Sequence, residues 1–377
     1  MELKKTHLYE YHKENGNIVD FGGFAMPVWY TGIKQEHNAV RESCGIFDTS
    51  HMGRTWIIGE EAERYLNYVV TNDVSTLEPN GGMYTVMCRP TGGIVDDLIL
   101  YKFSPEKFLF VYNASNREKD FNWLKKNTKG FEVKLENVSN KMAMIAVQGL
   151  KAQEITSELT EKNLDEIDRF QIAEANISGY DLFIARTGYT GEDGFELYIP
   201  DTTVEEPEKA MKIWNDLLEL GATPCGLGSR DTLRLEAGLW LYGNDIDEST
   251  NPIEAGLSWT VKLDKSGYFV GQRAIQEIKD DGIKRRLVGM KMEERGIPRH
   301  GYPIYNNEEE EIGVVTSGAL SPTLGVGIAM GYVEPDYRKR GTEVYIKIHD
   351  KLRKGKVVKY RPFYDESEYG FKRDKNE

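Results

Sequence analysis

Apolar residues recur at helical spacing most clearly in the segment Glu208–Leu220. Pro207 suits the first turn of a helix, and Gly221 suits its end. Shorter patterns of the same kind predict helices at Lys34–Arg41 and Glu61–Val70. In the longest of the three helices, the apolar positions fall on one stripe that would pack into a core. They are Ala210, Met211, Trp214, Leu217 and Leu218.

The pattern changes after about residue 280, where short strand-like segments alternate with turn residues. These segments predict a small all-β domain or barrel. They are Leu287–Met290, Ile312–Val315, Val326–Tyr332 and Val344–Ile348. The charged segment Lys279–Lys284 is the expected linker. Because 377 residues are too many for one simple core, we expect an α+β region at residues 1–265 and a β-barrel domain at residues 283–365.

Composition and charge exclude several classes of function. The net charge of −13 argues against nucleic-acid binding, which needs a basic surface. The apolar runs are far shorter than the roughly 20 residues that span a bilayer, so we expect no membrane insertion. Neither a secretory signal nor a transit peptide is recognisable at the N-terminus, so we expect a cytoplasmic location. The three cysteines and six histidines are scattered, which predicts neither a disulfide framework nor a metal site.

Two neighbouring aspartates follow a glycine turn in the segment Gly92–Tyr101. Alternate residues of a strand point to opposite faces, so Asp96 and Asp97 would each lie on a largely apolar face. A buried carboxylate needs hydrogen bonds or a charged partner. Turn capping, a structural ion pair, and an acid–base or hydrogen-bonding group in a ligand pocket all fit this pattern.

Two further segments place charged residues beside glycines. Thr187–Glu196 has three glycines in a short loop, which a tight hairpin would explain, although it explains Glu196 less well. The segment Cys225–Gly238 predicts a loop that enters a helix with Arg230 near its start. An anion there would be favoured by the helix dipole and by the arginine, but a salt bridge would also satisfy Arg230.

Taken together, the segments resemble the aminomethyltransferase, or T-protein, family of the glycine cleavage system. The resemblance runs from about His7 to Phe363, and seven segments occur in the order expected for the family. They are Val19–Pro27, Gly45–Gly53, Gly92–Leu98, Thr187–Glu196, Gly228–Gly238, Leu241–Glu248 and Thr316–Gly325.

The resemblance implies a fold, a reaction and two partners. The fold would be a multidomain cloverleaf of two α+β domains around a folate channel, with a C-terminal all-β barrel domain. The reaction would transfer a methylene carbon from the aminomethyl-lipoyl group of the H-protein carrier to tetrahydrofolate, and release ammonia. Tetrahydrofolate would be a co-substrate, and no metal would be needed. The basic stretches Arg338–Arg340 and Lys351–Lys356 are candidate docking sites for the carrier.

The resemblance also assigns roles residue by residue. Asp97 matches the essential carboxylate, which would lie beside N10 of the folate. Glu196 matches a residue that binds the pterin ring, and Arg230 matches an arginine that meets the glutamyl carboxylate. The other folate-binding candidates are Tyr84, Asn113, Met52, Tyr189 and Tyr369.

Two alternatives fit the same family features. One is a folate-dependent demethylase of a small methylated amine or sulfonium donor, because one fold can serve several reactions. The other is a folate-binding scaffold without enzymatic activity. The complete set of segments favours the aminomethyltransferase over the first. The joint presence of Asp97, Glu196 and Arg230 favours an enzyme over the second.

Overall fold

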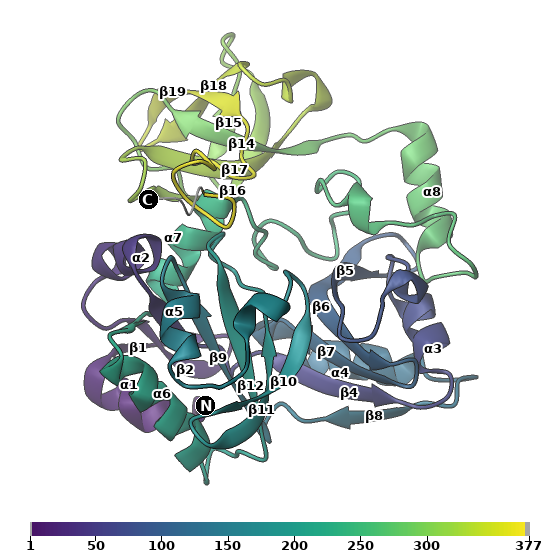
Figure 1. Cartoon of the computed structure of the whole chain (residues 1–377). Helices are drawn as coiled ribbons and strands as arrows, with labels where there is room; N and C mark the ends of the chain where they lie inside the picture. Colours follow the sequence, from purple (N-terminus) through teal and green to yellow (C-terminus); the bar gives the residue numbers. More distant parts are fainter. Residues whose placement is uncertain (1, 374–377) are drawn as a thin grey trace. The chain divides into compact units, whose positions relative to one another are not determined.

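The computed structural model describes residues 2–373 and divides into two compact units (Figure 1). The first unit comprises the chain up to residue 87, together with residues 96–230 and 267–269. The second unit comprises residues 88–95 and 231–266 and the chain from residue 270 onward. The division into domains at residues 1–265 and 283–365 stays a prediction from the sequence.

The larger sheet of the first unit has six strands in the order β10-β11-β12-β9-β3-β13. Its pairs are antiparallel, except that β13 runs parallel to β3. The strands are β10 (Ile172–Ile177), β11 (Tyr180–Ala185), β12 (Gly194–Pro200), β9 (Met142–Gln148), β3 (Gly45–Asp48) and β13 (Thr223–Pro224). Every residue of the central strand β9 is buried, as expected for a strand that is covered on both faces.

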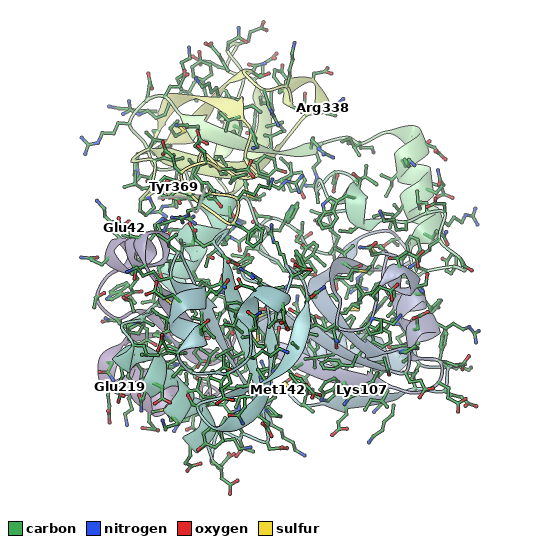
Figure 2. The ribbon with its side chains drawn as sticks, in the orientation of Figure 1. Glu42, Lys107, Met142, Glu219, Arg338 and Tyr369 are labelled. Carbon is green, nitrogen blue, oxygen red and sulfur yellow. The ribbon has the colours of Figure 1, made fainter. Side chains whose placement is uncertain are left out.

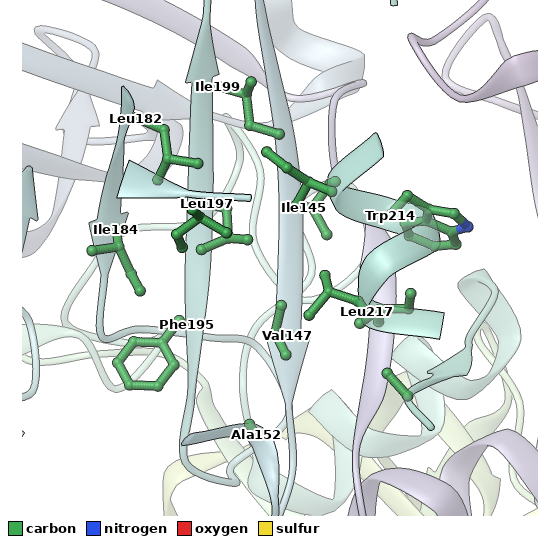
Figure 3. Packing of buried hydrophobic residues seen from close by; sticks show 14 of the residues in the cluster. Ile145, Val147, Ala152, Leu182, Ile184, Phe195, Leu197, Ile199, Trp214 and Leu217 are labelled. Atoms are coloured by element: carbon green, nitrogen blue, oxygen red, sulfur yellow. The ribbon is translucent and has the colours of Figure 1, made fainter. Parts of the chain in front are cut away.

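Helices α5 (Ala152–Ser157) and α6 (Glu208–Glu219) cover one face of this sheet. Figure 3 shows Trp214 and Leu217 of α6 beside Ile145 and Val147 of β9. The helix predicted from the apolar stripe is therefore confirmed, and its buried side chains belong to the core.

The second sheet has five strands in the order β5-β6-β7-β4-β8. These are β5 (Gly82–Cys88), β6 (Ile94–Ser104), β7 (Lys107–Tyr112), β4 (Gly53–Ile58) and β8 (Lys134–Asn137). Its core side chains, such as Trp56, Tyr101 and Leu109, pack with Met144 and Tyr198 from the larger sheet. The two sheets of the first unit therefore share an apolar layer.

The remaining elements of the first unit lie around these sheets. They are α1 (Tyr9–Asn15), β1 (Asn17–Phe21), β2 (Phe24–Trp29), α2 (Ile33–Glu42), α3 (Ala62–Val69), α4 (Arg117–Lys126) and the 3-10 turns η1 (Val74–Thr76), η2 (Ala114–Asn116) and η3 (Leu164–Glu166). Helices α2 and α3 occupy the two shorter predicted helical segments. Helix α7 (Leu227–Ala237) begins in the first unit and ends in the second.

The second unit contains a closed six-stranded barrel with the order β14-β17-β16-β15-β18-β19. Its strands are β14 (Arg286–Met292), β15 (Pro303–Tyr305), β16 (Glu311–Leu320), β17 (Gly327–Val333), β18 (Glu343–Ile348) and β19 (Lys351–Val358). Buried aliphatic side chains such as Val288, Met290, Ile304, Ala329 and Ile346 form its core. The α+β elements followed by a β-barrel confirm the fold class expected from the sequence.

The other elements of the second unit are α8 (Gln272–Asp281) and the 3-10 turns η4 (Ser258–Thr260) and η5 (Pro335–Tyr337). The segment expected as a linker, Lys279–Lys284, begins inside α8, which continues to Asp281 and is capped by Gly282, where φ is 86°. Its role as a linker stays a prediction. The charged residues at the end of α8 lie on the exposed side of this amphipathic helix, and Ile275 lies on its buried side. Over residues 2–373, none of the helices has the length and apolar character that crossing a membrane requires.

Candidate functional site

Three adjacent strands of the smaller sheet bring Tyr84, Asp97 and Asn113 together. Asp97 lies on β6, Tyr84 lies on the neighbouring strand β5, and Asn113 directly follows β7 on the other side. The Tyr84 hydroxyl donates to Oδ2 of Asp97 at 2.8 Å, and Nδ2 of Asn113 donates to Oδ1 at 2.9 Å. Both carboxylate oxygens of Asp97 are therefore held by side chains that the family resemblance assigns to the same folate pocket.

Asp96 is fully buried and has its own set of donors. Its Oδ1 accepts from Nδ2 of Asn113 at 2.9 Å and from Nδ2 of Asn116 at 2.8 Å. Its Oδ2 accepts from the backbone N–H of Asn113 at 3.1 Å. The single amide nitrogen of Asn113 thus contacts both aspartates, since one of its two hydrogens can serve each carboxylate.

The environment of Asp97 favours its protonated form. Burial is the main cause, and the negative charge of Asp96 adds to it, so the pKa of Asp97 rises to about 7. The hydrogen bonds from Tyr84 and Asn113 act in the opposite direction and limit the rise in the pKa. Near neutral pH this carboxyl group can therefore either accept or donate a proton.

Glu196 lies on β12 and is buried beside two tyrosines. Its Oε2 accepts from the Thr187 hydroxyl at 2.7 Å and from the Tyr198 hydroxyl at 3.1 Å. The hydroxyl of Tyr101 lies 2.9 Å from that of Thr187 and extends the network into the apolar layer between the sheets. Within residues 2–373, both hydrogen bonds to this carboxylate use Oε2, so Oε1 keeps its capacity to accept from a ligand.

Arg230, in the first turn of α7, lies against the ring of Tyr189, with its guanidinium carbon 4.6 Å from the ring centroid. This cation–π contact orients the guanidinium group. Its Nη1 is buried and makes no hydrogen bond to any residue in the range 2–373. Burial lowers the pKa of Arg230, while Tyr189 and Glu196 raise it. A buried N–H donor without an acceptor is costly, and a carboxylate ligand would satisfy it.

Glu36 was not predicted from the sequence as a site residue. It holds the residues directly before Arg230 in place. This carboxylate is fully buried on α2. Its Oε1 accepts from the backbone N–H groups of residues 30–32 at 2.7–3.2 Å. Its Oε2 accepts from the N–H of Gly226 at 2.8 Å and from the Ser229 hydroxyl at 3.4 Å. Glu36 therefore links the start of α2 to the start of α7.

The loop 187–194, which carries Tyr189, is held by buried ion pairs. Nη1 of Arg41 donates to Oε1 of Glu192 and to the carbonyl of Thr190, each at 2.9 Å. Arg186 donates to both carboxylate oxygens of Asp193, at 2.9 and 2.5 Å. A Cβ at Gly188 would lie 1.8 Å from Oε1 of Gln148, so this close approach requires glycine.

The last two candidates lie in different surroundings. Met52 is partly buried and packs against the apolar layer between the two sheets of the first unit. Tyr369, labelled in Figure 2, belongs to the second unit, where its ring packs edge-on against Tyr364 with centroids 6.2 Å apart.

The structure thus brings most of the predicted residues into one connected region of the first unit. Tyr84, Asp97 and Asn113 form a hydrogen-bonded group, and Tyr189 and Arg230 form a stacked pair. The two groups are electrostatically linked, because Tyr189 helps to raise the pKa of Tyr84. The negative charge of Glu196 in turn counteracts the lowering of the pKa of Arg230 by burial. For residues 2–373, no three His, Cys, Asp or Glu side chains are grouped so that they could hold a metal ion.

Comparison with protein families covers nearly all of the chain. The family model of the GCVT N-terminal domain matches residues 8–265, and that of the glycine cleavage T-protein C-terminal barrel domain matches residues 285–365. The chain belongs to the glycine cleavage T-protein family. The resemblance found in the sequence segments is therefore confirmed.

Individual relatives agree with this membership over nearly their full lengths. The chain is 48% identical to an aminomethyltransferase of Halothermothrix orenii, over 95% of this chain and 99% of that protein. It is 46% identical to an aminomethyltransferase of Thermosipho melanesiensis, with 96% and 97% covered. The crystal structure of glycine cleavage system aminomethyltransferase T from Bartonella henselae matches with a TM-score of 0.90 at 35% identity, over 98% and 99% of the two chains. These matches support an enzyme of the aminomethyltransferase type.

The raised pKa of Asp97 predicts a pH-dependent cost in stability. Its pKa is about 7 in the folded chain and near 3.8 when unfolded, so the folded state binds more protons between these values. Stability contributed by the protonated group is present at low pH and is lost as the pH rises toward 7. We expect Asp97→Asn to be more stable than wild type by about 1–3 kcal/mol at pH 8, and by much less at pH 4.

Urea denaturation at several pH values measures this difference. Asp20→Asn is the matched control, because Asp20 is exposed and its substitution keeps an acceptor for the N–H of Gly23. An Asp97→Asn variant whose stability parallels that of wild type at every pH would show that Asp97 is an ordinary, solvated carboxylate.

Proposed function

We propose that this chain is the aminomethyltransferase of a glycine cleavage system. It transfers the methylene carbon from the aminomethyl-lipoyl group of the H-protein carrier to tetrahydrofolate, giving 5,10-methylenetetrahydrofolate, ammonia and the dihydrolipoyl carrier. The observation that supports this most directly is the Asp97 carboxyl group, held between Tyr84 and Asn113 with a pKa of about 7, in a chain of this family.

The proposed reaction requires protons to move at neutral pH. Bonds form from the methylene carbon to N5 and N10 of the folate, and the bonds from that carbon to nitrogen and sulfur break. The hydrogens lost from N5 and N10 end on the departing ammonia and on the lipoyl sulfur. A carboxyl group whose pKa lies near the working pH is suited to carry one of these protons, and general acid–base help of this kind is worth about 10²–10⁴ in rate.

The other residues would bind and orient the folate. Glu196 would accept from N–H groups of the pterin ring, for which its Oε1 has capacity. Arg230 would donate to a glutamyl carboxylate, because its buried Nη1 needs an acceptor. Tyr84 and Asn113 would fix the Asp97 carboxylate, since positioning contributes as much to such reactions as proton transfer does. Further folate contacts are proposed for Met52, Tyr189 and Tyr369.

The two alternatives predict different substrates or none. A folate-dependent demethylase would act on a small methylated amine or sulfonium compound, and a scaffold protein would bind folate without turnover. Relatives named aminomethyltransferase match this chain over almost its whole length, which supports the proposed function over both alternatives. The deciding assay follows methylenetetrahydrofolate and ammonia formation from the aminomethylated lipoyl carrier. Turnover with a small methyl donor and none with the carrier would overturn the proposal.

A cytoplasmic location and metal-independent activity stay predictions from the sequence. The three cysteines are free and buried, so none of them is paired in a disulfide. Cell fractionation tests the location, and treatment of the active enzyme with a chelator tests the need for a metal.

The two neighbouring aspartates should differ sharply in function. Asp97→Asn keeps the shape and an acceptor but removes the charge, so we expect folate binding within about tenfold of wild type and a loss of about 10²-fold or more in kcat. Asp96→Asn should mainly lower stability, with a smaller loss of kcat than Asp97→Asn causes, because it disturbs three hydrogen bonds of a fully buried carboxylate. Thermal unfolding and turnover of both variants are the measurements. A folded but inactive Asp96→Asn beside a nearly normal Asp97→Asn would assign the chemistry to the other carboxylate.

Removal of the Arg230 guanidinium should weaken folate binding more than it slows bound turnover. A charge-assisted hydrogen bond to a carboxylate is worth roughly 1.5–3 kcal/mol. We therefore expect Arg230→Ala to raise KM for tetrahydrofolate by about tenfold or more at a near-normal kcat. Arg273→Ala, on the exposed surface of α8, is the control. Calorimetry that found the same tetrahydrofolate affinity in Arg230→Ala and wild type would refute this role.

A basic groove on the barrel unit is the candidate docking site for the carrier. The groove has a volume of about 920 Å³, and its basic lining residues are Arg286, Arg338, Lys339, Arg340, Lys359 and Arg361. Residues 338–340 are exposed (Arg338 is labelled in Figure 2). In the second basic stretch, by contrast, Lys354 and Lys356 are paired with Glu343 and Glu293. The structure therefore favours the first stretch as a source of positive potential.

Charge reversal tests this docking site. Changing Arg338 and Arg340 together to Glu should raise KM for the carrier by about tenfold, at an unchanged KM for tetrahydrofolate, because mutated rim charges mainly slow association. Lys129→Glu, an exposed change in the first unit and outside both basic stretches, is the control. Equal carrier KM values for the double variant and wild type would place the docking site elsewhere.

A further inference from the structure

A third buried carboxyl group lies next to the aspartate pair and has no role in the function described so far. Asp120 projects from the first turn of α4 and is fully buried. In the part of the chain that the structure describes, neither of its oxygens accepts a hydrogen bond from an N–H or hydroxyl group. The ammonium of its neighbour Lys119 is 3.9 Å from Oδ1, which is too far for a hydrogen bond.

The Asp120 carboxyl group lies one helical turn after Asn116, whose side-chain amide donates to Asp96, and it is within hydrogen-bonding reach of the Asp96 carboxyl group. Two ionised carboxylates offer only lone pairs and repel each other, so this contact requires a proton between them. The donors around the pair decide which residue holds it. Asp96 already accepts three N–H bonds, from Asn113 and Asn116, which stabilise its ionised form.

A cation between these carboxylates would be a different explanation for the cluster. The side-chain amides of Asn113 and Asn116 point N–H hydrogens at Asp96, and an adjacent positive ion would be repelled by them. Burial and the charge of Asp96 also raise the pKa of Asp120 well above its usual range. Both observations favour a proton over a metal ion.

We propose that Asp120 is a neutral carboxylic acid that donates a hydrogen bond to ionised Asp96, and that it acts as a positioning residue for Asp97 through Asn113. The side-chain amide of Asn113 connects the Asp96–Asp120 pair with Asp97. Asp120 holds Asp96, and Asp96 accepts one hydrogen of the Asn113 amide. The second hydrogen of that amide is thereby directed at Asp97, where Oδ1 and the backbone carbonyl lie 2.9 and 3.1 Å from the amide nitrogen.

The pair also sets the charge that Asp97 experiences. Three ionised carboxylates would be strongly unfavourable in this buried space, and the proton on Asp120 leaves Asp96 as the one fixed negative charge beside Asp97. The other titratable groups near the cluster include Tyr84 at Oδ2 of Asp97, Tyr189 beside Tyr84, and Lys119 beside Asp120. Tyr112 also faces it, because a charge on Asp120 helps to raise the pKa of Tyr112. Burial is the main cause that raises the pKa values of Tyr84 and Tyr112 above the ordinary tyrosine value, so both stay neutral between pH 6 and 9.

The proton itself is observable by infrared spectroscopy without any substrate. At about pH 9, where Asp97 is ionised, wild type should still show the carbonyl-stretch band of a protonated aspartate. Asp120→Asn should lack that band, and the matched variant Asp97→Asn should keep it. The absence of any protonated aspartate band in wild type at this pH would overturn the proposal, and so would its persistence in Asp120→Asn. This measurement does not depend on the proposed function.

The positioning role is tested by rescue, and this second arm rests on the proposed function. Asp120→Ala removes the donor to Asp96, so we expect kcat for methylene transfer to fall by about tenfold while KM for tetrahydrofolate stays within about twofold. Asp120→Asn restores a neutral N–H donor and should regain most of the lost kcat. If Asp120→Asn is as slow as Asp120→Ala, a donor to Asp96 is not what matters, and the positioning role is wrong.

Discussion

One buried negative charge, on Asp96, organises the candidate site. A carboxylate without solvent must find donors within the protein, and Asp96 finds them in the backbone and side chain of Asn113 and in the side chain of Asn116. This requirement fixes the turn after β7 against β6. The Asn113 amide that satisfies Asp96 also reaches Asp97, so the structural carboxylate and the candidate catalytic one share a single donor group.

The surroundings of the site follow the same rule, because buried charges are held mainly by fixed hydrogen bonds. Glu36 accepts from backbone N–H groups at two places and so sets the start of α7. Arg41 fixes the loop that carries Tyr189 through a carboxylate and a carbonyl. These contacts hold the site residues of the first unit in fixed positions, and fixed placement is what proximity effects need.

Much of the fold could be predicted from the sequence because local patterns determine it. The stripe in Glu208–Leu220 and the short alternating strands after residue 280 both produced the expected elements. Asp96 and Asp97 are both recognisable because a charged residue on a strand is unusual, and the family resemblance selects Asp97. Asp120 is not recognisable, since an acidic residue in the first turn of a helix is favourable in any exposed helix. Glu36 was not predicted for the same reason, because it lies in the first turn of α2. In both cases burial comes from segments distant in sequence, and no local pattern reports it.

The closure of the barrel limits how the second unit can meet another protein. Each of its strands from β14 to β19 is hydrogen-bonded on both sides, so the closed sheet offers no free edge to which a peptide could add as an extra strand. Recognition at this surface therefore has to be made by side chains. The same closure removes the template on which edge-to-edge aggregation between open sheets begins.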